Sequence, residues 1–151
     1  MERALGVFAR WLPGVWLGML LCLALIAAPS GFALLPAADA GRLVARLLVQ
    51  EAYLSLAAGM VLLVHERLLA RRSAQSGDSS QFSTGMLFAL GAVFCTVLGY
   101  FVLQPMMVQA RAGQGGWSFI QLHAASAVFF GLKLLLVALM SWRALRPGKP
   151  G

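Results

Sequence analysis

Four polar side chains lie inside stretches of the chain that are otherwise apolar, and they are the strongest candidates for chemistry. Glu51 lies in one such stretch, and His123, Ser126 and Lys133 share another. If these stretches cross a membrane, ionisable groups inside them are costly unless they face other helices or a water-filled cavity. A glutamate–histidine pair can relay protons or bind a cation; the alternative is a hydrogen bond between helices that sets their packing.

Helical spacing indicates which of these side chains can meet. At 100° per residue, His123, Ser126 and Lys133 fall within about 80° of one another around a helix. If alternate helices run parallel, Glu51 and His123 differ in depth by only about 2–3 Å, close enough for a hydrogen bond. Lys133 either has an interior partner or water, with Glu51 a candidate partner through water, or extends its stem toward the nearer interface. We therefore predict an intramembrane polar site made of Glu51, His123, Ser126 and Lys133.

Other chemistry has less support in the sequence. His65 and His123 would lie about 24 Å apart along parallel axes, too far for both to bind one haem iron. The spacing of Cys22 and Cys95 matches neither a zinc site nor a disulfide framework. We expect both to be small buried hydrophobic residues, with a Cu(I) site that recruits methionine sulfur as the weaker alternative. There is no nucleophile motif, HExxH or glycine-rich phosphate loop, so we expect no catalytic residue, no metal, no cofactor and no enzyme activity.

The elements that must position these side chains are four long apolar stretches. A bilayer core about 30 Å thick needs about 20 apolar residues in a helix, and each stretch meets that length. The composition agrees, because 60% of the 151 residues are hydrophobic and only 11% are charged. The sequence predicts an all-α integral membrane protein, a four-helix up-down bundle forming one domain over residues 1–151. The predicted spans are Trp11–Leu35, Leu47–His65, Met86–Met107 and Trp117–Trp142.

The first stretch has a second interpretation, a cleaved signal peptide over residues 1–28. Its apolar run continues through Pro29 and Phe32 to Leu35, longer than the 7–15 residues typical of a signal peptide's apolar region. We therefore expect a first transmembrane helix.

The basic residues predict the orientation of the bundle. Eight lie in the two tails and the middle loop, and three lie in or near the other two loops. Short loops rich in Lys and Arg stay in the cytoplasm, which predicts that both termini and the loop 66–85 are cytoplasmic. Nucleic acid is not an expected partner, because no basic face interleaved with aromatic residues lies outside the spans. The eight are Arg3, Arg10, Arg67, Arg71, Arg72, Arg143, Arg146 and Lys149; the three are Arg42, Arg46 and Arg111.

Several short motifs follow one another along the chain. They are Trp16 with Gly18, Ala28–Phe32, Ala40–Leu43, Gln104-Pro105, Arg111, and Phe119 to Leu122-His123 with Ser126. Their order and spacing resemble the transmembrane-protein-205-like family (domain of unknown function 4149), over about residues 11–143. The resemblance implies a four-span bundle, mostly in bacterial inner membranes, with no established reaction and therefore no functional residues to carry over. A eukaryotic member of the family is associated with tolerance to a metal-containing drug.

Two classes of function follow. We expect a non-enzymatic scaffold or stress-tolerance component whose partners are the lipid bilayer, a second copy of the chain or other membrane proteins. Gly14 and Gly18 favour this class, because small residues four apart let helices approach closely. The alternative is a small transporter or a metal- or proton-binding module that uses Glu51, His123 and Lys133.

Overall fold

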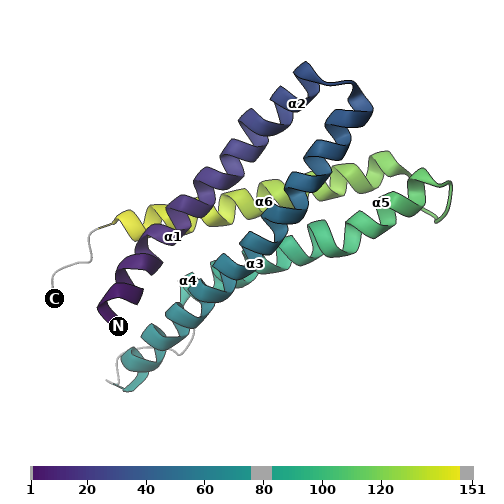
Figure 1. Cartoon of the computed structure of the whole chain (residues 1–151). Helices are drawn as coiled ribbons and strands as arrows, with labels where there is room; N and C mark the ends of the chain where they lie inside the picture. Colours follow the sequence, from purple (N-terminus) through teal and green to yellow (C-terminus); the bar gives the residue numbers. More distant parts are fainter. Residues whose placement is uncertain (1, 76–82, 147–151) are drawn as a thin grey trace.

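The computed structural model describes the backbone of residues 2–75 and 83–146, and these residues form four long helical stretches in an up-down arrangement (Figure 1). The first stretch is α1 (Glu2–Cys22), the π-helical segment η1 (Leu23–Ala27) and α2 (Ala28–Leu34). The second is the single helix α3 (Ala37–Gln75). The third is α4 (Thr84–Thr96), the π-helical segment η2 (Val97–Val102) and α5 (Leu103–Arg111), and the fourth is α6 (Phe119–Leu145). The prediction of an all-α four-helix bundle is confirmed.

All four stretches are long and apolar enough to cross a membrane. The protein is therefore a multi-pass membrane protein. The candidate spans are Gly6–Leu34, Ala37–Arg71, Thr84–Arg111 and Phe119–Leu145.

The second stretch is longer than the sequence predicted. With 39 residues, α3 measures about 58 Å at 1.5 Å per residue, nearly twice the thickness of a bilayer core. Helix therefore continues through residues 66–75, which the sequence predicts as part of the loop 66–85, and α4 begins at Thr84. Part of that loop, residues 76–82, lies outside the described residues. The apolar run gave the membrane-crossing length, whereas the polar ends of α3 extend the helix beyond it.

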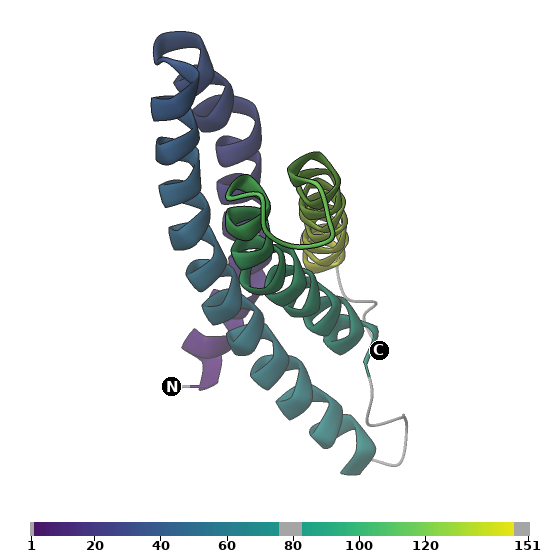
Figure 2. The same ribbon diagram turned by 90° about the vertical axis from the view of Figure 1, so that its right-hand side faces the viewer.

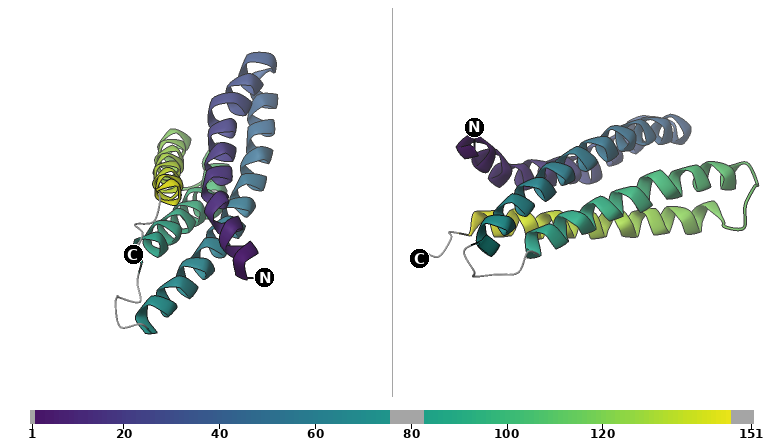
Figure 3. Two further views of the ribbon diagram at one scale, coloured as in Figure 1. Left: turned by 90° about the vertical axis from the view of Figure 1, so that its left-hand side faces the viewer. Right: turned by 90° about the horizontal axis from the view of Figure 1, so that it is seen from below.

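Prolines explain where the helices become irregular. Pro29 and Pro105 lack the N–H that would bond to the carbonyl four residues earlier, and those carbonyls belong to Leu25 in η1 and Phe101 in η2. The π segments end two and three residues before the prolines, at Ala27 and Val102. Pro13 lies inside α1, whose first turns tilt away from the rest of the helix (Figure 3).

The molecule has two different ends. At the end that we call the terminal end, α1 and α4 begin and α3 and α6 finish, whereas the turn end carries the α2–α3 and α5–α6 connections. Toward the turn end the two hairpins diverge: α2 packs on α3, and α5 packs on α6 (Figures 1 and 2). The continuous apolar core therefore lies between the middle of the bundle and the terminal end. It consists of Trp16, Leu20, Leu62, Ala89, Ala92, Val137 and Met140.

A close approach between α3 and α4 takes place at a glycine. A Cβ on Gly59 of α3 would lie 2.4 Å from the Val93 side chain of α4, so only glycine allows this packing. Gly18 makes no such close contact within the bundle, because a Cβ there would meet nothing within 4 Å. Gly14 lies at ordinary van der Waals distance from Ser141.

Candidate functional site

The polar site in the middle of the bundle is centred on the Glu51 carboxylate of α3. Lys133 of α6 donates a hydrogen bond to Glu51 Oε1 over 2.7 Å and forms an ion pair with it. Both residues are buried, with only 5% of Glu51 and 3% of Lys133 exposed. Lys133 lies one residue past the midpoint of α6, so the ion pair is near the centre of its span. The pair joins the two hairpins of the bundle, because α3 and α6 belong to different hairpins.

A hydroxyl connects this ion pair to the first helix. Ser55 lies one turn after Glu51 on α3 and donates its hydroxyl hydrogen to Glu51 Oε1. The Ser55 oxygen in turn accepts a hydrogen bond of 2.8 Å from the indole nitrogen of Trp16 on α1. Trp16 is 2% exposed and Ser55 is fully buried. We call the four residues Trp16, Ser55, Glu51 and Lys133 the central network; it ties α1, α3 and α6 together.

The surroundings of the Lys133 ammonium complete its environment. The Phe130 ring, one turn earlier on α6, has its centroid 5.1 Å from Nζ, within the range of a cation–π contact. Cys95 of α4 is also buried in the vicinity of Lys133. Cys95 is buried as predicted, whereas Cys22 is exposed, which corrects the prediction for that residue. All four helical stretches therefore contribute a residue to the central network or its immediate surroundings.

Local sequence signals set the start of the helices that carry these groups. Ser118 forms a capping box with Gln121 and begins α6, so the position of Lys133 along that helix is defined. Ser83 caps α4 by accepting a hydrogen bond of 3.0 Å from the backbone N–H of Met86.

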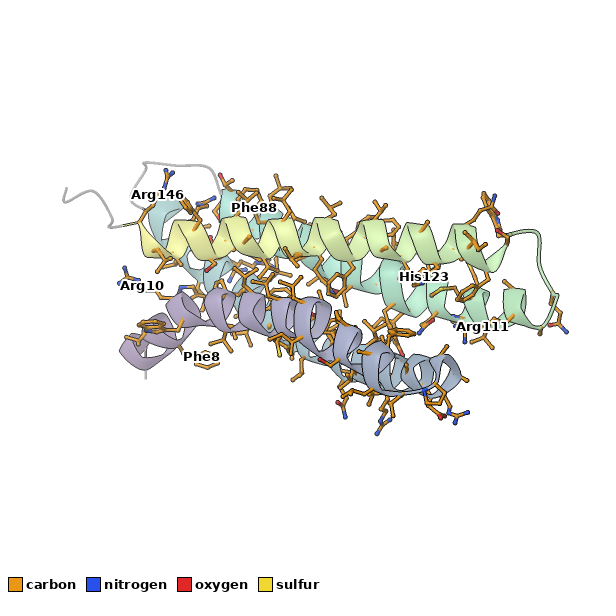
Figure 4. The ribbon with its side chains drawn as sticks, turned by 90° about the horizontal axis from the view of Figure 1, so that it is seen from above. Phe8, Arg10, Phe88, Arg111, His123 and Arg146 are labelled. Atoms are coloured by element: carbon orange, nitrogen blue, oxygen red, sulfur yellow. The ribbon has the colours of Figure 1, made fainter. Side chains whose placement is uncertain are left out.

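The structure separates the residues of the predicted polar site. Glu51 and Lys133 are in direct contact, but His123 is exposed near the turn end, where its ring stacks on Phe119 (Figure 4). The two ring centroids are 5.8 Å apart, and the Arg111 guanidinium lies 4.4 Å from the centroid of the Phe119 ring. Within the described part of the chain, no hydrogen bond or ion pair links His123 to Glu51. The glutamate–histidine pair considered from the sequence is therefore replaced by a glutamate–lysine pair.

Ser126 has a different role from the one predicted for it. Its hydroxyl donates a hydrogen bond of 3.0 Å to the backbone carbonyl of Gly99, which lies in η2. A π-helical turn and the following proline disturb the regular backbone pairing, and a serine from a neighbouring helix can satisfy a carbonyl that is freed in this way. Ser126 therefore joins α6 to η2.

Two residues of the central network were not in the predicted site. Ser55 is four residues after Glu51, the spacing at which side chains on one helix face meet. The sequence therefore contained a signal that could have placed Ser55 in the predicted site. Trp16 is the other residue, and it lies inside the predicted span Trp11–Leu35. Trp16 lies deeper in an apolar helix, where the indole N–H needs an acceptor.

The polar side chains of the central network are hydrogen-bonded to one another. Over the residues described, every buried side-chain nitrogen or oxygen atom has a hydrogen-bond partner. Over the same residues, no three His, Cys, Asp or Glu side chains come together as a group that could hold a metal ion. The arrangement can hold an opposite-charge pair in a low-dielectric interior, where one partner compensates for the burial of the other.

Comparison with known proteins adds a family but no activity. None of the curated proteins and none of the solved structures matches this chain. The family model for a domain of unknown function, DUF4149, matches residues 11–115, which is more than half of the chain. The four-span bundle with its buried Glu51–Lys133 pair thus belongs to the DUF4149 family.

Proposed function

We propose that this protein is a non-enzymatic scaffold or stress-tolerance component of the bacterial inner membrane, and that it works through helix contacts with other membrane proteins. The observation that carries the proposal is the closed central network: Glu51 has Lys133 and Ser55 as partners, and Ser55 also has Trp16. A site for a transported ion needs polar groups that can be offered to that ion. In the central network these groups are engaged with one another.

The energetics of such a pair favour a structural role. Removing one partner of a buried ion pair typically costs several kcal/mol, whereas replacing both by apolar residues is often neutral. The central network therefore sets which faces of α1, α3 and α6 meet. The closed network favours this over the alternative, a proton or cation path through Glu51, His123 and Lys133, because His123 lies apart from the other two.

The outer surface of the bundle is suited to contacts with lipid and with other helices. Large apolar side chains are exposed on all four stretches, among them Leu25, Leu54, Phe94 and Val128. The ends of α3 extend the helix beyond the thickness of a bilayer core and give a partner protein a surface outside the lipid.

The motif order described in the sequence analysis supports the proposed location in the bacterial inner membrane and the proposed role in stress tolerance. It resembles the transmembrane-protein-205-like family, whose members lie mostly in bacterial inner membranes and include a eukaryotic protein associated with drug tolerance. We take tolerance to chemical stress as the phenotype to measure.

A complementation experiment tests the proposal. The gene is deleted in its host, growth under membrane and metal stress is measured, and the strain is complemented with wild-type protein or with the double variant Glu51→Leu/Lys133→Met. A scaffold predicts that the double variant, once shown to fold and to reach the membrane, restores growth as well as wild type does. A folded double variant that restores nothing would contradict the scaffold and support ion handling by the pair.

A further inference from the structure

At the terminal end, an open groove lies on the surface of α4 and α6. Its volume is about 450 Å³, and its lining is almost entirely apolar apart from two guanidinium groups. Figure 4 shows Phe88 and Arg146 at this end of the molecule, opposite His123 and Arg111. The lining residues are Phe88, Leu139, Trp142, Arg143 and Arg146.

The two arginines of the groove are held by aromatic rings and not by acids. The Arg143 guanidinium lies 5.7 Å from the centroid of the Phe88 ring, and that of Arg146 lies 5.8 Å from a Trp142 ring. Among the residues whose side chains are described, neither arginine has a carboxylate partner. A guanidinium over a ring keeps its N–H donors at its edge, where they match the oxygens of a phosphate.

One carboxylate at the terminal end is already engaged. Of the described carboxylates, Glu66 is the one at the terminal end; it accepts a hydrogen bond of 2.6 Å from the Ser83 hydroxyl. Its carboxyl group also covers Gly85 on α4, where a Cβ would lie 2.3 Å from the carboxyl carbon. Glu66 therefore sits at the α3–α4 contact, while the groove lies between α4 and α6.

The groove residues on α6 are arranged along the helix as the parts of a lipid molecule are arranged across the membrane. Leu139 lies inside the span Phe119–Leu145, and Arg146 directly follows the end of α6. Arg146 is seven positions after Leu139, about 10 Å along the axis, which is the distance from acyl chain to headgroup level. Trp142 lies between them, at the depth where indole rings are favoured in membrane proteins.

We propose that this groove binds an anionic phospholipid, with its phosphate on Arg143 and Arg146 and an acyl chain along Phe88 and Leu139. Charge complementarity selects the class of lipid. Among the residues whose side chains are described, no carboxylate pairs with either guanidinium group, which favours a headgroup with net negative charge over one that also carries an ammonium group. This site is separate from the central network and does not depend on the proposed function.

Native mass spectrometry of the full-length protein in mild detergent tests the proposal directly. The probes are phosphatidylglycerol and phosphatidylcholine with identical acyl chains, titrated in competition. We expect preferential binding of phosphatidylglycerol. Each guanidinium at a membrane surface contributes about fivefold in affinity, so the double variant Arg143→Gln/Arg146→Gln should bind it about 30-fold more weakly.

A matched control removes the same number of charges at the other end of the molecule. The double variant Arg46→Gln/Arg111→Gln should keep its affinity for phosphatidylglycerol within about twofold, because these exposed arginines are at the turn end. An equal loss in both double variants would overturn the proposal, since it would show that net charge and not the groove selects the lipid.

Two further arms keep the test decisive. If Arg143→Gln/Arg146→Gln fails to fold by circular dichroism, Arg143→Lys/Arg146→Lys should still prefer phosphatidylglycerol, and a folded lysine variant without that preference contradicts the charge argument. Inorganic phosphate added at millimolar concentration should not displace the lipid, because it lacks the acyl chain. Displacement by phosphate would show a free-anion site instead.

Discussion

Replacing Lys133 by methionine should destabilise the bundle strongly, because it keeps most of the side-chain volume and removes the partner of Glu51. The carboxylate would stay buried, with 5% of the residue exposed, and would keep only the Ser55 hydroxyl as a donor. Removing one partner of a buried ion pair costs about 3–5 kcal/mol. Polar contacts between membrane helices are worth less than that range implies, so we expect about 3 kcal/mol. That corresponds to a change of roughly 150-fold in the unfolding equilibrium.

The second arm of the experiment removes both charges. In Glu51→Leu/Lys133→Met no unpaired charge remains, and the Ser55 hydroxyl can turn to the backbone carbonyl four residues earlier on its own helix. The double variant should therefore lie within about 1 kcal/mol of wild type and be more stable than either single variant. Glu51→Leu alone should cost about as much as Lys133→Met, because the Lys133 ammonium would retain only the Phe130 ring.

The free energies can be measured by unfolding the protein with SDS in mixed micelles and following helix content by circular dichroism. Leu132→Met is the matched control. Leu132 directly precedes Lys133 on α6 and is 45% exposed, so the substitution should lower the free energy of unfolding by less than about 0.5 kcal/mol. The reasoning would be refuted if Lys133→Met unfolded like Leu132→Met. It would also be refuted if the double variant lost as much as the two single variants together, since additivity means that the charges do not interact.

Three shorter predictions concern packing, the hydroxyl link and orientation. Gly59→Ala should lower the free energy of unfolding by about 1–3 kcal/mol, because its Cβ would lie 2.4 Å from Val93. Gly131→Ala is the control, because a Cβ there would meet nothing within 4 Å. It should leave the stability equal or higher in the same SDS titration. Ser55→Ala should cost about 1–3 kcal/mol and shift Trp16 fluorescence, because the indole N–H loses its acceptor; unchanged fluorescence would argue against the link. A green fluorescent protein fused to the C-terminus should fluoresce and an alkaline phosphatase fusion should be inactive, as cytoplasmic termini require; the reverse pattern would contradict the predicted orientation.

The lengths of the hydrophobic runs were sufficient to predict the four spans, but the residues at which the helices begin and end were seen only in the structure. The apolar stretch Leu47–His65 located the second crossing, but it could not show that α3 continues from Ala37 to Gln75. Helix ends outside the membrane depend on polar residues whose helical tendency is weak as a sequence signal.

The rotation of the fourth helix explains why the predicted site was only partly assembled. His123 and Lys133 are about 80° apart around the helix axis, which places them on neighbouring faces. With Lys133 turned into the bundle toward Glu51, the same angle leaves His123 exposed beside Phe119. The depth estimate that paired His123 with Glu51 assumed parallel straight helices, whereas the two hairpins diverge toward the turn end (Figure 1).

The central claim is that the buried Glu51–Lys133 pair holds the helices together and does not conduct ions. Proton flux into proteoliposomes, driven by a potassium diffusion potential and read with an entrapped pH dye, tests it most directly. The claim predicts that wild-type protein and the folded double variant Glu51→Leu/Lys133→Met give the same flux as protein-free vesicles. A wild-type flux that disappears in the folded double variant would contradict the claim and make the pair part of a proton path.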